Sequence, residues 1–264
     1  MYLSDYKVKK IIGRGSQGNI FSSERKRDGR EVVIKEVFKN TSSTNMIPNE
    51  VKLLQKVQNI EGVIKMLDFI NEKDCYYIVM EKINECEDLF QFLNNSGPLT
   101  EKFIRKMFHN IVKTVMKCRE RGVFHRDIKD ENILVDLNTY ETKLIDFGVG
   151  CEYDYKEDPN KMFEVQNFRG TLEFSPPECF KDENYQEESL TVWSLGILLY
   201  VMLHNGEIPY NTRMEICFGK LNWKNTKLSD EAQNLIDQCL MNKQENRIRL
   251  NNILSHSWMK KYEM

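Results

Sequence analysis

Short runs rich in apolar residues, separated by turn residues, recur in the first 81 residues, a pattern that is typical of strands. The pattern predicts strands at 6–12, 18–23 and 31–37, followed by two more at 62–71 and 75–81. Between the third and fourth strands, apolar residues at positions 47, 51, 54 and 57 recur at helical spacing, which predicts a helix over 48–57. The beginning of the chain therefore predicts a five-stranded antiparallel sheet with one main helix.

Helical periodicity dominates from residue 88 onward. Thr100 is a good N-cap for a long helix with Glu101 in its first turn, and one apolar stripe runs along this helix: Phe103, Met107, Phe108, Ile111, Val112 and Val115. Residues 189–200 are apolar nearly all round, which predicts a helix inside the core. We expect an α+β fold with a small sheet lobe over about 1–81, a hinge over about 82–85 and a larger, mostly helical lobe over about 86–264.

Composition narrows the class of protein only slightly. The chain has 264 residues and a net charge of -2, so charge gives no reason to expect nucleic acid or an anionic membrane as its partner. Its longest apolar stretch, at 192–203, is interrupted by Ser194 and Gly196 and is too short to span a bilayer. Seven scattered cysteines with no C-x-x-C pair favour reduced thiols in the cytoplasm, with the nucleus as a second possibility.

The candidate chemistry lies around a short predicted hairpin, formed by apolar runs at 133–135 and 143–145. Asp127 and Asn132 precede this hairpin, and Asp146 follows it within an Asp-Phe-Gly sequence. Phosphoryl transfer needs a carboxylate that orients a hydroxyl group, and hard oxygen ligands for Mg²⁺. The residues also match the order H-R-D-L-x-x-x-N and then D-F-G, with Ile128 in place of Leu.

A glycine-rich turn joins the first two predicted strands, with the sequence Gly13-Arg14-Gly15-Ser16-Gln17-Gly18. Such a turn lets the backbone close over phosphates. A dinucleotide-binding fingerprint would need a helix directly afterwards, and the strand-like residues 19–23 argue against one. Lys35 at the end of the third strand is typical of a phosphate-binding lysine, and Glu50 is its predicted partner. Farther along the chain, Arg247 is a predicted buried partner for Glu178.

Together these motifs resemble the catalytic domain of eukaryotic protein kinases over 6–259, and within it the Pim family of serine/threonine kinases. The closer resemblance to Pim is carried by 88–90, 125–134, 143–148, 175–178 and 192–200. Most kinases have an aspartate where this chain has Thr191 and use it to brace the catalytic loop, whereas Pim kinases also lack it. The resemblance implies a bilobal protein-kinase fold in one domain over 1–264, with ATP and Mg²⁺ as cofactors, protein substrates and a monomeric state.

The resemblance also implies roles for individual residues. Asp127 is the base that orients the substrate hydroxyl, and Lys129 contacts the γ-phosphate and favours Ser or Thr over Tyr as acceptor. Asn132 and Asp146 hold Mg²⁺, while Lys35, fixed by Glu50, positions ATP. Thr171 supports the geometry of the acceptor. The other expected ATP contacts are Ile12, Gly13, Arg14, Gly15, Ser16, Gln17, Gly18, Ile20, Val33, Met80, Glu81, Ile83, Leu134 and Ile145.

Two features remain open from the sequence. Asp88 and Glu131 match acids that bind arginine upstream of the acceptor, or else they are simply solvated. The activation loop at 149–170 contains no Ser or Thr. Its acids are either solvated or take the place of a loop phosphate beside Arg126: Glu152, Asp154, Glu157, Asp158 and Glu164.

We therefore expect a basophilic serine/threonine kinase that is active without phosphorylation of Ser or Thr in the activation loop. The alternative is a pseudokinase, a scaffold that binds nucleotide and partners without turnover. Degenerate kinases usually lose one of the residues equivalent to Lys35, Asp127 and Asp146, and all three are present here. The role of Tyr153 and Tyr155 is not predicted.

Overall fold

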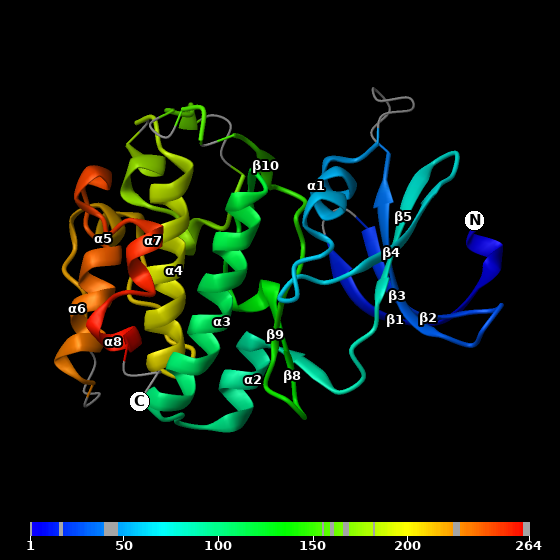
Figure 1. The fold of residues 1–264 in the computed structure, drawn as a ribbon, viewed down its shortest axis with the longest axis horizontal. Helices are drawn as coiled ribbons and strands as arrows, with labels where there is room; N and C mark the ends of the chain where they lie inside the picture. Colours follow the sequence, from blue (N-terminus) through cyan, green and yellow to red (C-terminus); the bar gives the residue numbers. More distant parts are fainter. Residues whose placement is uncertain are drawn as a thin grey trace.

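The computed structural model describes residues 2–15, 18–39, 47–154, 156–158, 161–165, 169–181, 183–223 and 228–260. Its sheet lobe contains the predicted five-stranded antiparallel sheet, in the order β1-β2-β3-β5-β4. The strands are β1 (Tyr6–Gly15), β2 (Gly18–Arg25), β3 (Glu31–Phe38), β4 (Met66–Asn71) and β5 (Cys75–Glu81). Helix α1 (Asn49–Val57) lies at the side of the sheet that is nearer to the second lobe (Figure 1).

The fourth strand begins later than its sequence pattern predicts, at Met66 rather than at Gly62. Val63 instead forms an isolated parallel bridge with Leu144. The backbone N–H of Leu144 donates to Gly62 O over 2.8 Å, and the N–H of Ile64 donates to Leu144 O over 3.1 Å. This apolar segment therefore connects the sheet lobe to the hairpin of the second lobe.

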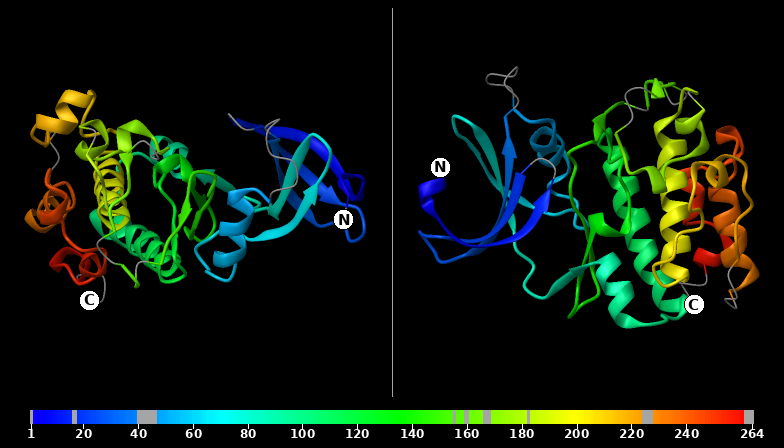
Figure 2. Two further views of the ribbon diagram at one scale, coloured as in Figure 1. Left: turned by 90° about the horizontal axis from the view of Figure 1, so that it is seen from above. Right: turned by 180° about the vertical axis from the view of Figure 1, so that it is seen from behind.

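The second lobe is mostly helical, and Figure 2 shows the two lobes side by side with one chain terminus in each. The hairpin of β8 (Ile133–Asp136) and β9 (Thr142–Leu144) lies between the sheet and helix α3 (Glu101–Glu120) in Figure 1. The helices of the second lobe are α2 (Leu89–Ser96), α3 (Glu101–Glu120), α4 (Glu187–Leu203), α5 (Arg213–Phe218), α6 (Asp230–Cys239), α7 (Leu250–Ile253) and α8 (Ser257–Lys260). Its strands are β6 (Cys86–Asp88), β7 (Val123–Phe124), β8 (Ile133–Asp136), β9 (Thr142–Leu144) and β10 (Cys151–Glu152). The exact lobe boundaries at 82–85 stay a prediction.

Short 3₁₀ turns complete the described elements: η1 (Leu3–Asp5), η2 (Asp130–Asn132), η4 (Leu172–Phe174), η5 (Pro177–Phe180) and η6 (Gln244–Asn246). None of the described helices is both long enough and apolar enough to cross a bilayer.

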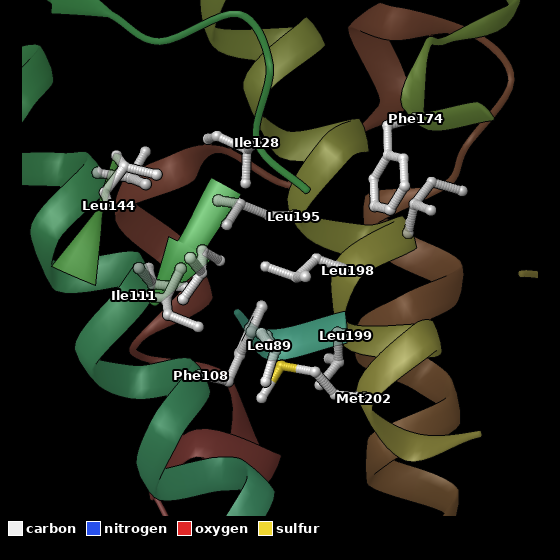
Figure 3. Close-up of a cluster of buried hydrophobic side chains, with 14 of the residues drawn as sticks. Leu89, Phe108, Ile111, Ile128, Leu144, Phe174, Leu195, Leu198, Leu199 and Met202 are labelled. Atoms are coloured by element: carbon white, nitrogen blue, oxygen red, sulfur yellow. The ribbon is translucent and has the colours of Figure 1, made fainter. Parts of the chain in front are cut away.

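The main hydrophobic core lies between α3 and α4. The apolar stripe of α3 faces inward as predicted, and almost every residue of α4 is buried, which explains why its sequence has no polar face. Figure 3 shows the side chains of both helices pointing toward one another: Phe108 and Ile111 from α3, and Leu195, Leu198, Leu199 and Met202 from α4. The core of the second lobe therefore provides a rigid base under the loops that follow β7 and β9.

The outer face of the sheet has a separate, smaller core: Tyr6, Val32, Ile34, Ile70, Tyr77 and Val79. Since side chains alternate along a strand, Val33 and Lys35 of β3 lie on the opposite face from Val32 and Ile34. The face that carries Lys35 is therefore turned away from this small core and toward α1.

The predicted contact between Arg247 and Glu178 is present in the core of the helical lobe. Nη1 and Nη2 of Arg247 each donate to one carboxylate oxygen of Glu178 over 2.6 Å. Both side chains are almost fully buried, at 1% and 2% exposure. Two parallel bonds of this kind fix η5, which directly follows the activation loop, against the segment before α7.

We expect Arg247→Leu to lower the free energy of unfolding by about 3–5 kcal/mol, because it leaves the Glu178 carboxylate buried without a cation. Denaturant titration measures this change. The exposed Arg249 provides the matched control, and Arg249→Leu should change stability by about 0.5 kcal/mol at most. The prediction is wrong if the two variants are equally stable.

Candidate active site

The predicted hairpin forms and brings Asn132 and Asp146 to one end of two paired strands. Ile133 of β8 pairs with Leu144 of β9, and the Ile145 N–H donates to Asn132 O over 3.0 Å. The chain immediately before β8 and the chain immediately after β9 are thus neighbours. Residues far apart in the sequence meet here because antiparallel pairing fixes the register.

Asp127 is held by hydrogen bonds to both of its carboxylate oxygens. Oδ2 accepts a bond of 2.8 Å from the Asn132 side-chain amide, and Oδ1 accepts one of 2.8 Å from the Thr171 backbone N–H. Thr171 therefore contacts Asp127 through its backbone. Lys129 Nζ lies 3.8 Å from Asp127 Oδ2 and 2.7 Å from Glu131, so a cation lies beside the carboxylate.

Lys35 connects the two lobes. Its Nζ lies 2.8 Å from both carboxylate oxygens of Glu50 in α1 and 2.8 Å from Asp146 Oδ1. Burial alone lowers the pKa of Lys35, but the carboxylates of Glu50 and Asp146 raise it above its usual range. Burial likewise raises the pKa of Asp146, and the charge of Lys35 reverses this and lowers it below the usual range. Both effects keep Lys35 and Asp146 charged at neutral pH.

Burial raises the pKa of Glu50 above its usual range, although the positive charge of Lys35 partly opposes this rise. Glu50 is only 4% exposed. The contact predicted between Lys35 and Glu50 is thus present, and it is a buried ion pair, whose separation would leave an uncompensated charge.

His125 joins the catalytic loop to the segment around Asp146. Its Nε2 lies 2.8 Å from Ile145 O, and its Nδ1 accepts from the Asp127 backbone N–H over 3.3 Å. A ring that accepts at Nδ1 and faces a carbonyl at Nε2 is neutral, with its proton on Nε2. Burial lowers the pKa of His125, which favours this neutral form. The ring also packs edge-on against Phe147.

Most residues expected to contact ATP come from the sheet and the hairpin. Ile20 is the cross-strand neighbour of both Gly13 and Lys35, and Val33 is the neighbour of Met80. Cross-strand neighbours share a face of a sheet, so these side chains lie on the same face as Lys35. Ile12 is exposed, whereas the remaining apolar members of the set are partly buried: Ile20, Val33, Met80, Ile83, Leu134 and Ile145.

The glycine-rich turn is described only at its two sides. Arg14 pairs with Asn19 and Gly15 pairs with Gly18, while Ser16 and Gln17 lie outside the described residues. A Cβ atom at Gly18 would lie 2.2 Å from the backbone oxygen of Glu36. Only glycine permits this close approach of β2 to β3.

At the end of β5, Glu81 links the sheet lobe to the helical lobe. Its backbone N–H donates to Lys65 O over 2.9 Å. Its side chain lies 3.3 Å from Lys143 Nζ of β9. Ile83 packs against the main core, so the segment after β5 is attached to both lobes.

The residues present fit a magnesium ion that is bound together with phosphates. Among the described residues, no three His, Cys, Asp or Glu side chains converge as a metal site built from protein alone would require. Mg²⁺ commonly takes only one or two carboxylates, with phosphate oxygens and water as its other ligands. Asn132 donates both of its observed amide bonds to Asp127, so its amide oxygen and the Asp146 carboxylate are the donors that remain.

The predicted acids Asp88 and Glu131 belong to an acidic cluster that also contains Asp130, which the sequence reasoning missed. Asp88 caps α2 through a bond of 2.7 Å from the Gln91 N–H. Burial raises the pKa of Asp88, and the charge of Glu131 raises it further. Burial raises the pKa of Asp130 to about 6, again with help from Glu131 and Asp88. Burial and neighbouring negative charge thus both raise the pKa of Asp88 and Asp130, and a cation at this place would be favourable.

The partner of Arg126 was also missed. Among the activation-loop acids, Glu152 pairs with Lys56 of α1. Arg126 pairs instead with Glu187, in the first turn of α4, through a bond of 2.8 Å from Nε and a second from Nη2. The suggestion that a loop acid takes the place of a phosphate is therefore corrected, because the carboxylate beside Arg126 comes from the helical core. Tyr155 lies outside the described residues.

Comparison with known proteins agrees with this geometry. The family model described as protein kinase domain matches residues 6–259. Serine/threonine-protein kinase pim-2 of Danio rerio is 36% identical over 270 residues, which cover 96% of this chain and 84% of that protein. Serine/threonine-protein kinase prk-2 of Caenorhabditis elegans is 34% identical over 98% of this chain and 59% of that protein. PSK2 of Saccharomyces cerevisiae is 30% identical over 97% of this chain, which spans only 24% of that serine/threonine-protein kinase.

The chain therefore belongs to the protein kinase family. More closely, it is a serine/threonine protein kinase similar to the Pim kinases.

We expect Asp130→Asn to raise the free energy of unfolding at pH 7.5, because it removes a buried charge while keeping the shape of the side chain. The folded-state pKa of about 6 lies above the 3.8 of an ordinary aspartate, so the wild-type penalty is largest above pH 6 and disappears as the pH falls through 6 toward 4. The shift corresponds to roughly 3 kcal/mol at most. Denaturant titration between pH 5 and 8 measures the difference.

Asp136→Asn is a control of opposite sign. Backbone hydrogen bonds from Thr139 and Asn138 lower the pKa of Asp136, so its replacement should destabilise the protein at neutral pH. An Asp130→Asn variant that is less stable than wild type at pH 7.5 would contradict the prediction.

Proposed function

We propose that this chain is a catalytically active kinase that transfers the γ-phosphate of ATP to Ser or Thr hydroxyl groups of protein substrates. The observation that carries the proposal is the connected set of hydrogen bonds at the site. Lys35 binds Glu50 and Asp146 in one part of it, and Asn132 binds Asp127 in the other. A scaffold that only bound partners would have no need for this costly alignment of charges.

The polar atoms of the site residues support a proposed role for each residue in phosphate transfer. Asp127 has one hydrogen bond on each oxygen and keeps lone pairs for the hydroxyl proton of the substrate. Lys129, next to Asp127, is placed to offset negative charge on the transferring group. Asn132 and Asp146 would hold Mg²⁺, which supplies Lewis-acid stabilisation of the phosphate oxygens when bound. Lys35 would hold the α- and β-phosphates, with Glu50 fixing its direction.

For the nucleotide base, we propose the face of the sheet that carries Lys35. Ile12, Ile20 and Val33 would cover one side of adenine, and Leu134 and Ile145 the other. Met80 would lie behind the ring, and the Glu81 carbonyl and the Ile83 N–H would bind its edge. The glycine-rich turn at 13–18 would cover the phosphates.

The acidic cluster of Asp88, Asp130 and Glu131 supports a preference for substrates with arginine upstream of the acceptor. Burial is the main cause of the raised pKa of Asp88 and Asp130, and neighbouring acids add to it; a guanidinium placed there would compensate the negative charge. Glu131 also pairs with Lys129, so it connects the cluster to the site of transfer.

We further propose activity without phosphorylation of Ser or Thr in the activation loop, and a monomer in the cytoplasm with possible nuclear presence. The seven cysteines are all free thiols, which supports a reducing compartment.

The proposed role of Asp127 is tested by Asp127→Asn, which should reduce kcat by about 10²–10⁴-fold, because a general base contributes about that much. Transfer of radiolabelled phosphate from ATP to an arginine-rich serine peptide measures the rate. Melting temperature should change little, since Asn keeps the shape of the side chain. Exposed Asp74 supplies the control, and Asp74→Asn should be as active as wild type. Wild-type protein that binds Mg-ATP without turnover would favour the scaffold alternative.

A second experiment tests the substrate preference. Asp88→Asn keeps a residue that caps helices well, but it removes the charge that would pair with arginine. We expect kcat/KM to fall about tenfold or more for a peptide with upstream arginines, because a charge-assisted bond contributes about 1.5–3 kcal/mol. The rate for the same peptide with alanines should be unchanged. Equal rates of the wild-type enzyme on both peptides would remove the proposal.

A further inference from the structure

Arg126 is a residue of the catalytic loop with an unusual backbone conformation. It has a φ of 66°, a left-handed conformation that is unfavourable for a residue with a side chain. It directly precedes Asp127, so a change in its backbone would turn the Asp127 carboxylate away from Asn132 and Thr171. Some other part of the protein must hold Arg126 in place.

Glu187, in the first turn of α4, binds the Arg126 side chain. Its carboxylate accepts two hydrogen bonds from the Arg126 guanidinium, one of them 2.8 Å long. The Glu187 side chain has 0% exposure and that of Arg126 has 10%. Salt and water screen a carboxylate this deep only weakly, which strengthens its pairing with Arg126. Its place in the first turn of a helix also favours the negative charge.

The activation loop packs around this ion pair from two directions. Cys151 Sγ lies 3.5 Å from Glu187 Oε1, and Cys151 belongs to β10, which pairs with β7 just before the catalytic loop. The Phe163 ring lies 5.6 Å from the Arg126 guanidinium, and Phe163 forms an antiparallel bridge with Tyr185 just before α4. The pair thus joins the catalytic loop, two points of the activation loop and α4.

Thr191 lies one helical turn after Glu187 on α4. Its hydroxyl donates to the backbone oxygen of Glu187 over 2.7 Å, within the same helix. The Glu187 side chain instead pairs with Arg126 of the catalytic loop.

We propose that Glu187 is a built-in positioning residue that keeps Arg126, and through it Asp127, in working geometry without any phosphate on the activation loop. This inference rests on the proposed kinase function and names the group that makes the activity independent of modification. Glu187 supplies from the folded core the negative charge that Arg126 requires.

The test uses the full chain, treated with phosphatase and shown by mass spectrometry to carry no phosphate. Glu187→Gln keeps the shape of the side chain and removes its charge. We expect kcat for the arginine-rich serine peptide to fall about 10- to 100-fold, as a displacement of about 1 Å in a catalytic group can do. KM for ATP should change less than about twofold, because the side-chain contacts of Arg126 described above, with Glu187 and Phe163, involve no residue proposed to bind ATP.

A double variant separates positioning from stability. In Arg126→Met/Glu187→Leu, apolar side chains replace the buried pair, an exchange that often leaves stability unchanged or improved. We expect a folded protein, by melting temperature, whose kcat is as low as that of Glu187→Gln. Wild-type kcat in this double variant would overturn the inference, because the pair would then serve stability alone.

Two activation-loop acids serve as controls. Asp154→Asn and Glu157→Gln alter exposed carboxylates of the loop, and both variants should keep the wild-type kcat. Loss of activity in these variants, with normal activity in Glu187→Gln, would assign the role to the loop acids and overturn the inference. Wild-type protein that transfers no phosphate would overturn both the proposed function and this inference, whereas an active wild type with an equally active Glu187→Gln would overturn the inference alone.

Discussion

The burial of Lys35 between two carboxylates is the constraint that aligns the two lobes. The ammonium comes from β3, Glu50 comes from α1 and Asp146 follows the hairpin of the helical lobe, and each contact is 2.8 Å long. Removing the charge of Lys35 or of Glu50 leaves the other charge of this buried pair uncompensated, which is expensive. The sheet, α1 and the hairpin must therefore adopt one relative position for the charges to be compensated.

Buried polar contacts also hold strained backbone at two positions near the site. Arg126 and Asp146 both have left-handed φ values, at 66° and 59°, and such conformations cost about 1–3 kcal/mol each. The His125 ring bonds the backbone oxygen of Ile145, just before Asp146, and the backbone N–H of Asp127, just after Arg126. Glu187 holds the Arg126 side chain. The strain persists because these contacts of His125 and Glu187 hold the backbone in place. The packed core of α3 and α4 supports them.

Local patterns explain why much of the fold could be predicted. The sheet, the hairpin and the buried helix at 189–200 follow from periodicity, and the pairs of Lys35 with Glu50 and Arg247 with Glu178 follow from motifs that place complementary charges. The late start of β4 could not be predicted, because it depends on a bridge between Val63 and Leu144, distant in sequence.

The partner of Arg126 could not be predicted for a related reason. Five acids in the activation loop are nearer in sequence, and composition gives no means of ranking them against Glu187, 61 residues away. Burial decides the pairing, since a carboxylate excluded from water gains far more from an arginine than an exposed one does. A phosphate on a loop can be added and removed, whereas a glutamate in a core helix is fixed when the chain folds. If Glu187 acts as proposed, the geometry of Asp127 is set by folding itself, and the activity of each molecule depends on ATP and substrate rather than on the history of its activation loop.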